Sequence, residues 1–117
     1  MAIKDIYRGD TKTYKITQTD SLGAIVDVTG WEIWFTLKLN DDDLDTAAVL
    51  QVKYVIPPGA DATAGIAYMV IDSTDTEVAV DKYFYDFQRV VPGSPPDVAT
   101  LEKGKVKILQ DITLGNV

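Results

Sequence analysis

The residues with the clearest chemical potential are the carboxylates of an acidic run in the first half of the chain. Asp41, Asp42 and Asp43 are followed by Asp45, and hard cations such as Ca²⁺ bind several carboxylate and carbonyl oxygens. The run lacks the glycine and the distal glutamate of the helix-loop-helix calcium loop. Because a solvated charge run at the end of a strand is the commoner arrangement, we predict no metal site and keep these four aspartates as weak candidates.

A pair of carboxylates is the second candidate. Asp81 and Asp86 are close in the sequence, and two carboxylates about 5 to 10 Å apart across a cleft perform acid–base chemistry in glycosidases. Nothing in the sequence places these two across a cleft, and a domain of this size has little room for one. We expect Asp86 instead to accept hydrogen bonds from backbone or hydroxyl groups at a sheet edge.

A third motif, Arg8-Gly9-Asp10, spells an integrin-binding tripeptide. A match of three residues is common by chance, and Gly9 gives the segment the backbone freedom that a turn needs. We therefore predict a turn between two strands at this position.

Histidine and cysteine are absent from the chain. Their absence removes imidazole bases, thiolate nucleophiles, disulfides and the usual zinc or copper ligands together. We predict that the protein is not an enzyme and uses no cofactor.

Length and charge set limits on the architecture and the partners. A chain of 117 residues fits a single domain over residues 1–117. The net charge of −7 comes from 18 acidic and 11 basic side chains spread along the chain, so phosphate backbones would be repelled on average. No apolar run approaches the roughly 20 residues of a membrane span, and the N-terminus lacks an apolar signal core. We expect no nucleic acid and no membrane as partners, and synthesis as a soluble cytoplasmic product.

The clearest structural signal is the segment from Trp31 to Leu39. Its apolar residues occupy alternate positions, which is the period of a strand with one buried face. We predict a central β-strand here, with the aromatic Trp34 on its solvent face. Further strands are predicted at residues 3–7, 12–18, 24–28, 49–56, 66–71 and 82–91.

The C-terminal part is predicted to form a hairpin. Strand-forming residues from Asp97 to Leu101 and from Val106 to Thr113 flank a Glu102–Lys105 turn that would need positive φ at Gly104. About seven short strands without a long helix indicate an all-β fold, and we predict an immunoglobulin-like antiparallel β-sandwich, with a small β-barrel as the alternative. Tyr83, at the start of a strand, occupies the place of a tyrosine corner.

Five residues on strand faces turned away from the predicted core form a candidate interface. Contiguous apolar surface usually marks a contact, and these residues are Trp34, Ile66, Tyr68, Val70 and Phe84. The alternatives are a strand read in the wrong register or a loop such as Pro57–Gly65 that covers them.

Several short motifs, in order along nearly the whole chain, resemble the N-terminal domain of baseplate upper proteins from tailed bacteriophages and prophages. The motifs are Arg8-Gly9-Asp10-Thr11, Val28-Thr29-Gly30, Phe35-Thr36-Leu37-Lys38, Asp75-Thr76, Tyr83-Phe84-Tyr85-Asp86-Phe87-Gln88, Thr100-Leu101-Glu102-Lys103-Gly104 and Asp111-Ile112-Thr113.

This resemblance implies a virion component without catalytic residues, an immunoglobulin-like module that docks into a tail or baseplate ring or acts as a neck adaptor. Its implied partners are other phage structural proteins and further copies of itself, after synthesis in the bacterial host cytoplasm. Members of the family often continue into a fibre-forming or receptor-binding part, whereas this chain ends at Val117. The alternative function is a carbohydrate- or surface-binding module whose exposed aromatics stack on sugars, with calcium at the acidic run.

Overall fold

The computed structural model describes residues 3–40, 48–93 and 95–110, and over these residues the fold is almost entirely β. The elements are β1 (Ile6–Tyr7), β2 (Lys12–Thr17), β3 (Glu32–Lys38), β4 (Leu50–Val55), α1 (Ala60–Thr63), β5 (Ile66–Ile71), β6 (Asp81–Val91) and β7 (Asp97–Leu109). The prediction of an all-β fold is confirmed.

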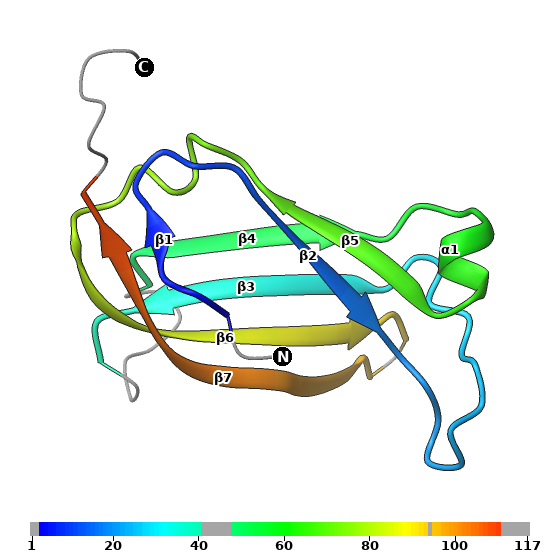
Figure 1. Cartoon of the computed structure of the whole chain (residues 1–117). Helices are drawn as coiled ribbons and strands as arrows, with labels where there is room; N and C mark the ends of the chain where they lie inside the picture. Colours follow the sequence, from blue (N-terminus) through cyan, green and yellow to red (C-terminus); the bar gives the residue numbers. More distant parts are fainter. Residues whose placement is uncertain (1–2, 41–47, 94, 111–117) are drawn as a thin grey trace.

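The strands form two sheets that face each other. One is a five-stranded sheet of order β1-β7-β6-β3-β4, and the other is a two-stranded ribbon of β2 and β5 that lies obliquely across one face of it (Figure 1). All strand pairs are antiparallel except β1 and β7, which run parallel. Purely antiparallel pairing was therefore a wrong prediction, because the first strand enters the sheet beside the last one and in the same direction.

The core fills the space between the ribbon and the inner face of the five-stranded sheet. On β3, Ile33, Phe35 and Leu37 are fully buried, as the alternation predicts. At the two ends of the predicted strand the alternation fails, because Trp31 is half-buried and Leu39 is 49% exposed just after β3. The ring of Phe35 lies 4.9 Å from that of Phe87, and the ring of Tyr14 on the ribbon lies 5.3 Å from Phe87. Other buried residues that face this core are Ile16, Ala67, Met69, Ile71, Tyr83, Tyr85, Val106 and Ile108.

The predicted C-terminal hairpin is wrong. Residues Asp97–Leu109 form one continuous strand that pairs along β6, with an irregularity opposite Phe87 and Gln88. Gly104 pairs with Tyr85, and a Cβ at Gly104 would lie 3.0 Å from the Tyr85 ring and 3.1 Å from its hydroxyl oxygen. The glycine is explained by this close approach of a ring, and it does not have the positive φ of a turn.

The segment from Ala24 to Val28 also differs from its prediction. It contributes one isolated bridge, between Thr19 and Ile25, and no strand. Asp20 Oδ1 accepts hydrogen bonds from the backbone of Leu22 and Ala24, and such local acceptors compete with strand pairing. The predicted loop after Pro58 contains the short helix α1.

Two local predictions agree with the structure. The Tyr83 hydroxyl donates a hydrogen bond of 2.6 Å to the carbonyl of Ala79, which is the contact that defines a tyrosine corner. Arg8-Gly9-Asp10 is a turn: Gly9 has φ +86° and the Asp10 backbone N–H donates to Tyr7. The buried hydroxyl of Thr76 donates to the Asp10 carbonyl over 2.7 Å, which fixes this turn.

Gly65 precedes β5 where two other segments approach its backbone. Its φ is +79°, and a Cβ there would lie 2.5 Å from the Gln18 carbonyl oxygen and 3.0 Å from that of Val26. We predict that Gly65→Ala lowers the free energy of unfolding by about 2–4 kcal/mol, because left-handed strain adds to a clash with backbone. Gly23→Ala, at φ +82° with open space around it, should cost only about 1 kcal/mol. Urea unfolding measures both, and equal losses would contradict this packing.

Tyr14 gives the core a dependence on alkaline pH. Burial raises the pKa of its phenol to about 12, with a smaller contribution from Tyr85. In the unfolded chain the phenol loses its proton near pH 10, so its contribution to stability is complete below pH 10 and is lost between pH 10 and 12. We predict that Tyr14→Phe reduces this alkaline loss of unfolding free energy, measured by urea unfolding across that range. Tyr68→Phe, at an exposed tyrosine, should keep the wild-type decline, and an identical decline in all three proteins would refute the assignment.

Candidate functional site

The structure does not bring the five predicted interface residues together. Trp34 and Phe84 lie on the outer face of the five-stranded sheet, whereas Ile66, Tyr68 and Val70 lie on the outer face of the ribbon. Because the ribbon covers the inner face of the sheet (Figure 1), these two outer faces point in opposite directions. A single continuous interface made of all five residues is excluded by this geometry.

The outer face of the ribbon carries exposed apolar side chains from β5. Tyr68 is 44% exposed and Val70 is 42% exposed, while Ile66 is half-buried at the start of the strand, next to α1. We call this surface the ribbon face. Its residues are Thr13, Lys15, Thr17, Ile66, Tyr68 and Val70, which form three cross-strand pairs.

The outer face of the five-stranded sheet carries both aromatic and charged side chains. Trp34 is half-buried: its indole N–H donates to Glu32 over 3.1 Å, and the Lys53 ammonium lies 5.7 Å from its ring centre. The Lys105 ammonium lies 5.6 Å from the ring centre of Phe84. Both rings are therefore covered by cations of the protein itself, in cation–π contacts.

Lysine dominates this surface, which we call the sheet face. Its charged residues on β3, β4, β6 and β7 are six lysines and two carboxylates, namely Lys38, Lys53, Lys82, Lys103, Lys105, Lys107, Glu32 and Asp86. Asp5, just before β1, adds a third carboxylate beside Lys107. Six lysines against three carboxylates leave a surplus of three positive charges on a chain whose net charge is −7, so the remainder carries ten negative charges. The protein therefore has a basic face although the net charge of the whole chain is negative. The alternating Lys103, Lys105 and Lys107 were the available sequence signal, and the predicted turn at Gly104 concealed it.

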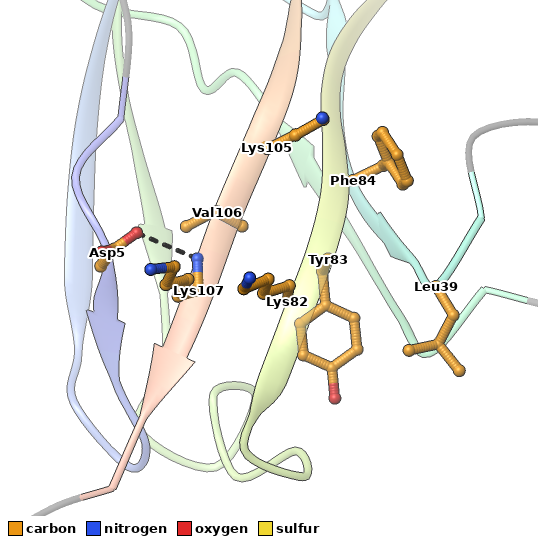
Figure 2. Close-up of a pocket in the computed structure, with 8 residues that line it drawn as sticks. All are labelled: Asp5, Leu39, Lys82, Tyr83, Phe84, Lys105, Val106 and Lys107. Carbon is orange, nitrogen blue, oxygen red and sulfur yellow. Dashed lines mark hydrogen bonds between the residues drawn. The ribbon is translucent and has the colours of Figure 1, made fainter.

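The lysines gather around a pocket of about 430 Å³ at one end of β6 and β7. Lys82 and Lys107 are directly opposite each other in the strand ladder, and Lys105 is opposite Phe84. Figure 2 shows the two facing lysines side by side and Lys105 extending toward Phe84. The remaining lining residues are Asp5, Leu39, Tyr83 and Val106.

The three lysines that line this pocket outnumber its carboxylates. Asp5 is the carboxylate of the lining, and its Oδ1 accepts a 3.0 Å hydrogen bond from the backbone N–H of Lys107. None of the ion pairs seen among the described residues involves Lys82, Lys105 or Lys107. Like charges directly opposite in a ladder repel each other, so the pocket is suited to an anionic group.

The carboxylate pair considered for acid–base chemistry is not assembled. β6 alternates its side chains, so Asp86 lies on the sheet face and Asp81 on the opposite side of the strand. Asp81 Oδ1 accepts a hydrogen bond from the neighbouring Lys82 backbone. β6 is flanked by β7 and β3, so the predicted sheet-edge position of Asp86 is wrong.

The metal candidates Asp41, Asp42, Asp43 and Asp45 lie outside the described residues. Among the residues that the structure does describe, no three His, Cys, Asp or Glu side chains are grouped so as to hold a metal ion. The same described part also contains no helix with the length and apolarity needed to cross a bilayer.

Comparison of the chain with protein-family models, with curated proteins and with solved structures finds no match. The relationship to phage baseplate proteins therefore remains a prediction drawn from the sequence motifs.

The facing lysines make a direct test of the pocket possible. We predict that Lys107→Glu raises the free energy of unfolding by about 0.5 kcal/mol at low salt, because an opposite-charge pair with Lys82 replaces a repulsive one. The gain should shrink in about 1 M salt, where screening acts within about 3 Å. Lys15→Glu changes the net charge equally but lies opposite Tyr68, and should give no gain. Equal effects of the two changes in urea unfolding would contradict the lysine pair.

Proposed function

We propose that this chain is a non-catalytic structural module that holds neighbouring proteins through its two outer sheet faces. The observation that carries the proposal is the opposition of an exposed apolar ribbon face to a lysine-rich sheet face. Contiguous exposed apolar residues such as Tyr68 and Val70 favour protein contact.

Two unlike faces on opposite sides support a position between neighbours. Heterologous contacts join different surfaces of successive subunits and generate rings or stacks. Contact between two lysine-rich sheet faces would be repulsive, so self-association is expected through the ribbon face or between unlike faces. This geometry suits a component of a multimeric assembly.

The specific assembly that we propose is a phage or prophage particle, in which the chain is a tail, baseplate or neck adaptor. Support comes from the ordered motifs that resemble baseplate upper protein N-terminal domains. We also propose an immunoglobulin-like sandwich as the finer description of the fold. Two facing sheets and the hydrogen bond from Tyr83 to Ala79 support that description.

A carbohydrate-binding function is the second candidate, supported by the exposed ring of Tyr68 on the ribbon face. Sugars stack on open aromatic rings, whereas Trp34 and Phe84 are already covered by lysines. A glycan panel tests this function: a signal that Tyr68→Ala removes would favour it over protein contact. The absence of any glycan signal would eliminate it.

The particle hypothesis predicts that virions released by the bacterium that encodes the chain contain it. Mass spectrometry of purified particles measures this, and particles free of the chain would refute a virion role. In the same system we expect Tyr68→Ser with Val70→Ser to lower infectious titre at least tenfold, because two exposed contact residues of the ribbon face are lost.

Leu22→Ser is the matched control for that double variant. Leu22 is 92% exposed in the connection after β2 and belongs to neither face, so its titre should stay at the wild-type level. If the ribbon-face variant assembled and infected as the control does, the contact would have to lie elsewhere. Light scattering of the purified chain from micromolar to millimolar concentration separates contact with other proteins from self-association.

A further inference from the structure

The proposed module function does not explain the positive charge of the lysine pocket at the end of β6 and β7. Three cations line it, and the carboxylate of Asp5 is directed to the Lys107 backbone. Lys82 and Lys107 are opposite each other in the strand ladder, and neither takes part in the ion pairs seen among the described residues. A bound anion would remove this repulsion, so complementarity of charge selects a negatively charged ligand.

Apolar side chains restrict the kind of anion. Leu39, Phe84 and Val106 line the same pocket, and its volume of about 430 Å³ lies within the roughly 300–1,000 Å³ of typical organic-ligand sites. A bare inorganic ion would leave most of this space and the apolar surface unused. A carboxylate side chain carried on a polypeptide, next to an apolar residue, matches both parts of the lining.

Nucleic acid is the other polyanion to weigh. Non-specific single-strand binding combines a positive groove with open aromatic faces on which bases stack. On the sheet face the ammonium groups of Lys53 and Lys105 already cover the rings of Trp34 and Phe84. A base would have to displace these cations, whereas a carboxylate binds Lys105 where it stands. The net charge of −7 further repels long polyanions.

We propose that the pocket formed by Lys82, Lys105, Lys107 and Phe84 binds an acidic segment of a partner protein, with carboxylates on the lysines and an apolar side chain beside Phe84. The assignment of a protein as the ligand rests on the proposed module function. The chemistry of the ligand, carboxylate with an apolar neighbour, comes from the pocket itself.

Amide chemical shifts of the purified full chain test this proposal. The probe is a heptapeptide of glutamates with one central phenylalanine, and the control probe has glutamine in place of glutamate. We expect the acidic peptide to shift the resonances of residues 81–84 and 104–107 in a saturable manner and the glutamine peptide to leave them unchanged. Binding should weaken as salt rises, because the contacts are exposed ion pairs.

Two matched variants locate the site. Lys82→Gln with Lys107→Gln should weaken the peptide roughly five- to tenfold, as expected for the loss of two exposed charge contacts. These changes relieve repulsion, so folding is not at risk. Lys12→Gln with Lys15→Gln removes the same charge from β2 on the ribbon and should leave the affinity unchanged. The aspartates at 41–45 are retained in every variant, so any competition from them is constant.

Four results would overturn the proposal: no binding of the acidic peptide, equal binding of the glutamine peptide, equal losses in the two lysine variants, or tighter binding of a hexathymidylate than of the peptide. The last result would identify the sheet face as a nucleic-acid surface. Inorganic phosphate that shifts the same resonances with equal affinity would be a fifth contrary result, because it would show that the apolar part of the pocket contributes nothing. Because the measurement uses the purified chain, its failure is distinct from absence of the chain from virions.

Discussion

The fold depends on the burial of a ribbon that could not exist alone. A two-stranded antiparallel pair is marginal in water, so β2 and β5 need the inner face of the larger sheet as their support. The Tyr14 ring contributes to this contact, because it packs against both Phe35 and Phe87. Aromatic pairs of this kind add about 0.5–1.5 kcal/mol each beyond the area they bury. With one face of each sheet committed to this core, most charged residues of the strands lie on the outer faces.

Sequence reasoning succeeded where the information is local. Alternation of apolar residues placed Ile33, Phe35 and Leu37 in the core and Tyr68 on a face turned away from it, because side-chain direction in a strand follows from position alone. The Arg8–Asp10 turn and the Tyr83 hydroxyl contact were equally local. These features could be predicted without knowledge of which strand pairs with which.

The sequence predictions failed where the structure depends on which strands pair with each other. Gly104 was predicted to be a turn residue. A glycine is needed there because the ring of Tyr85 on the neighbouring strand lies close to its backbone, and no local sequence pattern reveals this contact. The faces of Trp34 and Tyr68 were assigned correctly, yet only the packing of the ribbon on the sheet shows that they point away from each other. Likewise, Lys82 and Lys107 are separated by 24 intervening residues, so their juxtaposition depends entirely on the β6–β7 register.

The parallel pairing of β1 with β7 has a consequence for how the chain reaches this state. Ile6 aligns with Ile108, so the first strand has no partner in the sheet until the last one has been synthesised. β2 similarly waits for β5, with the whole of β3 and β4 between them. Pairings so distant in sequence make loop closure the slow step, and domains of this type fold in milliseconds to seconds. On the ribosome, the N-terminal strands must therefore stay unpaired while most of the chain emerges.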